Sequence, residues 1–296
     1  MRILFISSNR IGDAVITCGV LDRLIREHPG CRVTIACGPA AAGVFARMPN
    51  RERTILVEKH KDNRHWFRLW AQVALTRWDL VVDIRGSGLA YLLPARRRVV
   101  RRRGPGRMFE QHGAMLGMNP APLPVAWTAP EDDARAASLL PPGPHYIGLG
   151  VTANWDLKVW APERFVALFQ ALAAGPVPGA RAAIFAGPGA AERARAAPVL
   201  AALPGAIDLA GTLSIPEATA AIRRCALFVG NDSGLMHLAA AAGARTIGLC
   251  ATTSNRAQEM APAGLHAAWA LADGTSMGAL TVEAAYASCM EMLTQA

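Results

Sequence analysis

The sequence has no paired cysteine motif. Its six cysteines never stand as CxxC, and none has a zinc-like spacing to histidine. No export signal is recognisable ahead of the first of them. We therefore expect reduced, mostly buried thiols in a cytoplasmic protein that needs neither a structural metal nor a cofactor.

Long apolar runs are also absent. The first run, residues 3–6, is too short for an export signal, and the longest candidate, residues 235–251, is interrupted by His237, Gly243 and Arg245. A membrane-spanning helix needs about 20 consecutive apolar residues, so we expect a soluble or peripheral protein. Half of the residues are hydrophobic, which is enough to bury one or two large cores and argues against disorder.

Positive charge is concentrated in one segment. The formal net charge is +9, and residues 96–107 read RRRVVRRRGPGR, with seven arginines in twelve positions. One interpretation is a solvated, arginine-rich loop. The other is a surface for anionic lipid or for phosphates on an acceptor. The candidate residues for this second role are Arg10, Arg96, Arg97, Arg98, Arg101, Arg102 and Arg103.

Short apolar runs alternate with helical patterns along the chain, which predicts an α/β fold with parallel sheets. Strands are expected at residues 2–6, 33–36, 53–57, 80–84, 146–150, 182–186, 227–230 and 246–250. Helices are expected at residues 13–28, 40–48, 65–76, 162–173, 190–203, 234–242 and 278–293. The segment LLPPGP at 139–144 cannot continue an element and predicts a linker between two domains.

We therefore expect two Rossmann-like domains that face a central cleft. The first covers residues 1–143 and the second residues 144–277. A final helical segment, residues 278–296, is expected to be able to pack back onto the first domain.

The loop after the first strand, SSNRIGD at 7–13, is a candidate site because open α/β sheets bind ligands at strand ends. It carries neither GxGxxG nor GxxxxGK[ST], which argues against a nicotinamide-type dinucleotide fingerprint and a P-loop. It offers one carboxylate, Asp13, at a helix start. Asp13 is either a catalytic base or a helix N-cap.

Two later loops offer groups that suit a phosphate. Thr152 and Lys158 follow the first strand of the second half, while Trp160 is expected to pack on the core. Asp232, Ser233, Gly234 and His237 follow another strand, where helix-start N–H groups could hold a diphosphate or simply be capped. A weaker signal is Gly187 with Glu192, whose carboxylate could bond a ribose.

Three segments in this order resemble glycosyltransferase family 9, the heptosyltransferases of lipopolysaccharide core assembly. They are RIGDAVITCGVLDRL, KVWAPERFVALF and FVGNDSGLMHLAAAAGARTIGL. VVDIRGSGLAYLL and FEQHGAMLGM are also similar to that family's first domain. One departure is Ala161, which stands where the family usually has proline.

The resemblance implies a GT-B fold and inverting, metal-independent sugar transfer. The donor, ADP-heptose, would bind the second domain and a glycolipid acceptor the first. Asp13 would be the general base and Lys158 would meet the donor diphosphate. Asp232, Gly234 and His237 would line the donor site, and Glu192 would contact the ribose. The protein would then be cytoplasmic, with peripheral contact to the anionic inner membrane.

Two other functions fit parts of the sequence. A nucleotide-sugar epimerase would keep the phosphate-binding second half but would need no acceptor. A basic polyanion-binding protein without catalysis would explain residues 96–107 but would leave the loops of Asp13 and Asp232 without a role. For that reason nucleic acid is not expected as a partner.

Overall fold

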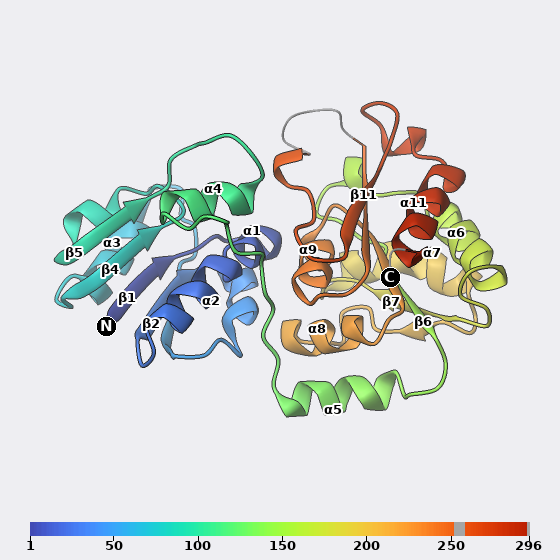
Figure 1. The fold of residues 1–296 in the computed structure, drawn as a ribbon, viewed down its shortest axis with the longest axis horizontal. Helices are drawn as coiled ribbons and strands as arrows, with labels where there is room; N and C mark the ends of the chain where they lie inside the picture. Colours follow the sequence, from blue (N-terminus) through green and yellow to red (C-terminus); the bar gives the residue numbers. More distant parts are fainter. Residues whose placement is uncertain (252–257, 295–296) are drawn as a thin grey trace. The chain divides into compact units, whose positions relative to one another are not determined.

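The computed structural model describes residues 1–251 and 258–294. The chain forms two compact units, Met1–Trp127 and Thr128–Ala296 (Figure 1). The boundary lies earlier than the expected linker at residues 139–144. The reason is that helix α5, Pro130–Leu139, packs against helix α8, Ile215–Arg223, of unit 2.

Unit 1 is built on a five-stranded parallel sheet with the order β3-β2-β1-β4-β5. On one face, Leu4 and Ile6 of β1 pack against helix α3 and the short helix η2. Alternation along a strand sends Ile3 and Phe5 to the opposite face. The strands are β1 Arg2–Ile6, β2 Arg32–Cys37, β3 Arg51–Leu56, β4 Trp78–Asp83 and β5 Ala95–Val100. The helices are α1 Ile11–Ile16, α2 Cys18–Glu27, η1 Pro39–Phe45, α3 Arg64–Val73, η2 Leu89–Leu92 and α4 Met108–Met115.

Unit 2 contains a six-stranded parallel sheet with the order β11-β10-β9-β6-β7-β8. One core of this unit lies between the sheet and helices α6, α7 and α11. The strands are β6 Tyr146–Gly150, β7 Arg181–Phe185, β8 Ile207–Asp208, β9 Leu227–Asn231, β10 Thr246–Cys250 and β11 Ala267–Leu271. The remaining helices are η3 Asp156–Lys158, α6 Pro162–Ala174, α7 Ala190–Ala202, α9 Gly234–Ala241, η4 Met277–Ala279 and α11 Val282–Thr294.

The C-terminal helix packs within unit 2. Helix α11 contacts α6, β10 and β11, and its Cys289 and Met292 are part of the unit 2 core. Residues 295–296 of the expected C-terminal segment lie outside the described residues. The structure therefore places this helix with the second domain.

Two local expectations are wrong. The single helix expected at residues 13–28 is two helices, because Thr17 donates its hydroxyl proton to the carbonyl of Ala14 at 2.6 Å and separates α1 from α2. The interpretation of residues 96–107 as a loop is wrong for the first five positions, which belong to edge strand β5. An edge strand tolerates charge on its exposed side.

Candidate functional site

Each sheet has a point where the strand order reverses, and loops that follow strands at such a point form ligand sites in open α/β folds. In unit 1 the reversal lies between β1 and β4, since the chain first builds β2 and β3 on one side of β1 and then β4 and β5 on the other. In unit 2 it lies between β6 and β9. The residues predicted from the sequence follow these strands.

Asp13 lies in the first turn of α1, directly after the loop that follows β1. The N-cap of this helix is Arg10, whose carbonyl accepts the N–H of Ala14, so Asp13 is not the capping residue. The half-buried Asp13 carboxylate accepts a hydrogen bond from the Ser8 hydroxyl at 3.3 Å. The alternative role of an N-cap therefore does not apply, and the carboxylate keeps accessible oxygen for another donor.

A second set of polar groups follows the neighbouring strand β4. The buried Asp83 carboxylate accepts bonds from the backbone N–H of Arg85 and from both the N–H and the hydroxyl of Ser87. The Arg85 guanidinium donates to Asn9 at 3.0 Å and lies 4.7 Å from the ring centre of Trp66. Burial lowers the pKa of Arg85. Asp83 thus holds a loop that presents a cation beside the Asp13 loop.

Close backbone packing fixes the position of the Asp13 loop. Gly38 follows β2, and a Cβ atom there would lie 2.7 Å from the Cα of Asn9. Such a contact requires the backbone to move, so only glycine fits. Sequence analysis missed Ser8, Asp83, Arg85 and Gly38, because their roles depend on which strands are neighbours.

The structure divides the arginine run into two groups. Arg96, Arg97 and Arg98 lie along the edge strand β5. Arg101, Arg102 and Arg103 follow its carboxyl end, where the N–H of Arg101 bonds the carbonyl of Asp83. Only this second group is on the same edge of the sheet as Asp13.

Helix α4 adds a buried histidine next to the second arginine group. Both ring nitrogens of His112 are buried and have no hydrogen-bond partner within the described ranges. Burial, and then the charge of Arg101, lower the pKa of His112 to about 4. His112 is therefore neutral at physiological pH.

In unit 2, Lys158 and Asp232 form an ion pair between the loops after β6 and β9. The Nε2 atom of His237 lies 4.0 Å from the other carboxylate oxygen of Asp232. Lys158 remains partly exposed, whereas Asp232 is largely buried and His237 is buried. An ammonium group has three donors, so pairing with Asp232 leaves Lys158 able to bond further oxygen atoms.

The start of helix α9 lies beside this pair. Ser233 is its N-cap, but the Ser233 side chain makes no capping bond, and its buried hydroxyl oxygen has no partner among residues 1–251 and 258–294. Gly234 is the first helical residue. The N–H groups of a helix start, left without a side-chain acceptor, attract an anion.

Asn231, which sequence analysis missed, supports the loop that carries Lys158. The fully buried Asn231 side chain accepts the N–H of Trp160 at 3.0 Å. The Trp160 indole is also fully buried, as predicted, and donates to the carbonyl of Leu280 at 2.8 Å. Trp160 of the Lys158 loop therefore donates a hydrogen bond to Asn231, the residue before Asp232, and this bond holds the two loops together.

The remaining predicted residues lie on the same edge of the unit 2 sheet. Thr152 is buried directly after β6. The Glu192 carboxylate accepts the N–H of Gly187 at 3.2 Å and lies 3.6 Å from the Arg195 guanidinium. Since β6 pairs with both β7 and β9, the Thr152–Lys158 loop lies between the Glu192 loop and the Asp232 loop.

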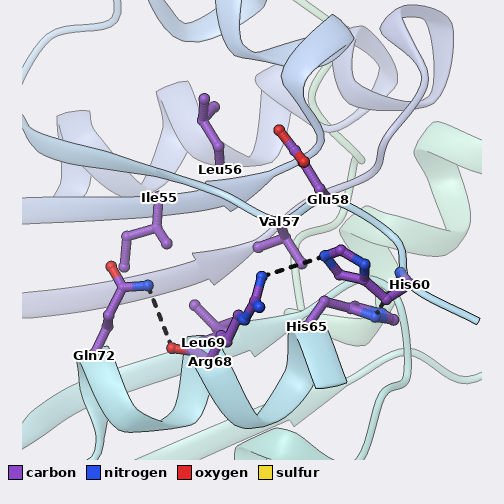
Figure 2. A pocket seen from close by; sticks show the side chains of 9 residues that line it. All are labelled: Ile55, Leu56, Val57, Glu58, His60, His65, Arg68, Leu69 and Gln72. Atoms are coloured by element: carbon purple, nitrogen blue, oxygen red, sulfur yellow. Dashed lines mark hydrogen bonds between the residues drawn. The ribbon is translucent and has the colours of Figure 1, made fainter. Parts of the chain in front are cut away.

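A separate pocket of about 110 Å³ lies in unit 1. Figure 2 shows it between strand β3 and helix α3, with His60 and Arg68 at one side. The Arg68 guanidinium lies 3.4 Å from Nε2 of His60, and the N–H of His60 bonds Nδ1 of His65. Burial lowers the pKa of His65. None of the predicted site residues lines this pocket.

Three features concern metals, membranes and redox state. In the part of the chain that the structure describes, no cluster of three or more His, Cys, Asp or Glu side chains could hold a metal ion. No described helix has both the length and the apolar character to cross a bilayer. All six cysteines are buried thiols, as predicted, and burial raises the pKa of Cys37, Cys225 and Cys289 to about 12.

Comparison with solved structures identifies the fold. The chain is similar to a family 9 glycosyltransferase from Veillonella parvula DSM 2008, with a TM-score of 0.83 and 18% identity over 100% of this chain and 97% of that one. It is also similar to E. coli ADP-heptose LPS heptosyltransferase II (TM-score 0.79, 19% identity, 100% and 99% covered). E. coli heptosyltransferase WaaC with ADP is similar too, with a TM-score of 0.75 and 17% identity over 99% of this chain and 100% of that one. The predicted GT-B fold of two Rossmann-like domains is confirmed.

Comparison of sequences gives the family. No curated protein matches the sequence. The profile described as glycosyltransferase family 9 (heptosyltransferase) matches residues 106–271, which is 166 of the 296 residues. Because this match covers more than half of the chain, the protein belongs to glycosyltransferase family 9 and is a glycosyltransferase.

Proposed function

We propose that the protein transfers heptose from ADP-heptose to a lipopolysaccharide core or a related glycolipid, with inversion and without a metal ion. The observation that carries this proposal is the Lys158–Asp232 pair beside the uncapped start of α9, at the strand-order reversal of unit 2. This arrangement offers an ammonium group and backbone N–H donors to a diphosphate. Adenine and heptose are proposed because the chain is similar to an ADP-heptose heptosyltransferase and to a heptosyltransferase with ADP.

The proposed reaction is a single displacement. Asp13 accepts the proton of an acceptor hydroxyl while that oxygen attacks the anomeric carbon. The bond from the anomeric carbon to the diphosphate oxygen breaks on the opposite face, so the configuration inverts and ADP leaves. Base catalysis of this kind contributes about 10²–10⁴-fold to the rate.

In this proposal the leaving group is stabilised by Lys158 and by the N–H groups at the start of α9. These donors meet the negative charge that develops on the diphosphate, which is the role that a metal ion has in other transferases. Asp232 orients Lys158, and Thr152, Ser233, Gly234 and His237 line the donor site. Gly187 and Glu192 are proposed to contact the ribose.

On the acceptor side, we propose that Arg10 and residues 101–103 contact phosphates of the glycolipid. They lie on the edge of the unit 1 sheet that carries Asp13. Arg–phosphate pairs are strong because guanidinium and phosphate can form two parallel hydrogen bonds. Six buried thiols fit a cytoplasmic location, where ADP-linked sugars would be consumed.

The test combines purified protein, ADP-heptose and heptose-deficient lipopolysaccharide. The expected result is release of ADP, a mass gain of one heptose on the acceptor, and an inverted anomeric bond, all unchanged by EDTA. A sugar isomer that forms without acceptor would instead identify an epimerase. Absence of ADP release with every glycolipid acceptor would contradict the proposal.

A further inference from the structure

Three large apolar side chains are exposed together on one face of unit 1. Phe67 of α3 is 68% exposed, and Tyr91 and Leu92 of η2 are 66% and 69% exposed. Their neighbours on α3 and η2, such as Leu69 and Leu89, are buried in the core. The exposed residues are therefore not needed to cover the sheet.

Contacts through Trp70 connect these residues into one surface. The rings of Phe67 and Trp70 are stacked with centroids 5.8 Å apart. The Trp70 indole N–H donates to the backbone carbonyl of Leu92 at 3.2 Å. Phe67, Trp70 and Leu92 are thus in contact, and the exposed Tyr91 precedes Leu92 on η2; we call these four residues the α3–η2 patch.

Arginines border this patch. The Arg98 guanidinium, on the neighbouring strand β5, donates to the carbonyls of Ala90 and Leu93 on either side of Tyr91 and Leu92. Arg96 on the same strand and Arg64 at the start of α3 are also exposed, although Arg96 lies 3.5 Å from Asp79 and Arg64 lies 2.8 Å from Asp62. The patch therefore combines aromatic and aliphatic groups with cations at its rim.

The net charges of the two units show that unit 1 is the basic part of the protein. Residues 1–127 contain 21 Lys and Arg against 9 Asp and Glu, a net charge of +12. Residues 128–296 contain 10 against 13, a net charge of −3. The protein's net positive charge thus comes from the unit that carries the α3–η2 patch.

We infer that the α3–η2 patch docks on an anionic lipid bilayer. Tyrosine and tryptophan favour the membrane–water interface, where the ring is apolar and the polar group stays hydrated. Each arginine near an anionic surface adds to the attraction. The positive charge of unit 1 favours an anionic partner surface. The exposed apolar side chains favour a partner with an apolar interior, and an anionic bilayer has both properties.

The patch adjoins the loop that presents Arg85. This loop joins β4 to η2, and Arg85 lies over Trp66, one turn before Trp70 on α3. Docking by the patch would hold this acceptor-side edge near the lipid surface. That consequence rests on the proposed function, whereas membrane binding itself does not.

The test is co-sedimentation of the full chain with vesicles of phosphatidylcholine alone or with 30% phosphatidylglycerol. Binding is expected to phosphatidylglycerol vesicles and to be at least 10-fold weaker to phosphatidylcholine. The double variants F67S/L92S and R64Q/R96Q are each expected to weaken binding about 10-fold. Matched controls in unit 2 are Leu265→Ser, at a leucine that is 79% exposed, and Arg181→Gln, and both should bind like wild type.

Further measurements separate this inference from the proposed function. F67S/L92S should keep the wild-type unfolding temperature and its turnover on a water-soluble acceptor fragment, while losing turnover on acceptor in vesicles. Wild-type binding by F67S/L92S, or equal loss in Leu265→Ser, would overturn the inference. Binding that R64Q/R96Q loses but F67S/L92S keeps would also overturn it, since it would mean purely electrostatic contact.

Discussion

The ammonium group of Lys158 and the carboxylate of Asp232 pair across 74 positions of sequence. The pair joins the loops after β6 and β9, the two strands at which the strand order of unit 2 reverses. Lys158 is partly exposed, whereas Asp232 is largely buried. This geometry presents a positive charge whose position is fixed before any ligand arrives.

Replacing Lys158 should weaken donor binding. Lys158→Ala removes a charged hydrogen-bond donor to the diphosphate, which is worth about 1.5–3 kcal/mol, so the Kd for ADP should rise about 10- to 100-fold. Asp232→Asn should have a smaller effect, because it keeps the ammonium and loses only its orientation. Calorimetric titration with ADP at constant ionic strength measures both.

Arg181→Gln serves as the control for Lys158, since Arg181 is an exposed cation of the same unit at the start of β7. Its Kd for ADP should equal that of wild type. Unchanged ADP affinity in Lys158→Ala would remove Lys158 from the proposed diphosphate site.

Asp13 should be essential for turnover but not for donor binding. Asp13→Asn preserves shape and removes the base, so kcat should fall about 10²–10⁴-fold while the Kd for ADP stays unchanged. Asp22→Asn, an acidic residue on the next helix that pairs with Arg26, is the matched control and should keep wild-type kcat. If Asp13→Asn lost turnover because the protein no longer folds, Asp13 would have a structural role instead.

Ser8 positions Asp13 in this proposal, and its loss should be milder. Removing the hydroxyl that bonds the carboxylate costs about 1.5 kcal/mol, so Ser8→Ala should lower kcat about 10-fold. KM for the donor should not change, because Ser8 contacts only the carboxylate of Asp13 in this proposal. Wild-type kcat in Ser8→Ala would contradict a positioning role, and Ser8→Thr should restore activity.

Much of the fold could be predicted from the sequence, because its signals are local. Apolar runs of four or five residues mark the buried strands, and Pro162 marks the first residue of α6. Edge strand β5 was missed, since three successive arginines give no apolar alternation. The early unit boundary was missed because it depends on α5 packing against α8, a contact between residues far apart in sequence.

The candidate site could be predicted only in part, because the sequence gives its polar clusters but not their positions relative to one another. Clusters of Asp, Ser and Gly after strands could be recognised individually, but which clusters are neighbours depends on strand order. The pairing of Lys158 with Asp232 and the support of the Trp160 loop by Asn231 follow from β6 lying next to β9. The residues RGSG after β4 are recognisable as a polar loop in the sequence. The sequence does not show that the buried Asp83 carboxylate accepts the hydrogen bonds that hold this loop.

Asn231 should contribute to stability through its hydrogen bond to Trp160. Asn231→Ala leaves a buried backbone N–H without an acceptor, which should lower the free energy of unfolding by about 1–3 kcal/mol. Trp160→Ala should cost more, about 3–5 kcal/mol, because it also leaves a cavity. Urea denaturation measures both, and Trp155→Ala, at an exposed tryptophan of the same loop, should change the value little.

His112 should make unit 1 sensitive to mild acid. Burial keeps the histidine neutral in the folded protein and lowers its pKa from 6.5 to about 4, whereas the unfolded chain takes up the proton near pH 6.5. The unfolded state therefore binds more protons between these values, and stability falls as the pH drops from 6.5 to 4, by up to about 3 kcal/mol. His112→Asn does not titrate, so its stability should fall less over this range than that of wild type. His266→Asn, at an exposed histidine, should follow the wild-type pH profile, and identical profiles for all three proteins would show that the His112 ring is solvated.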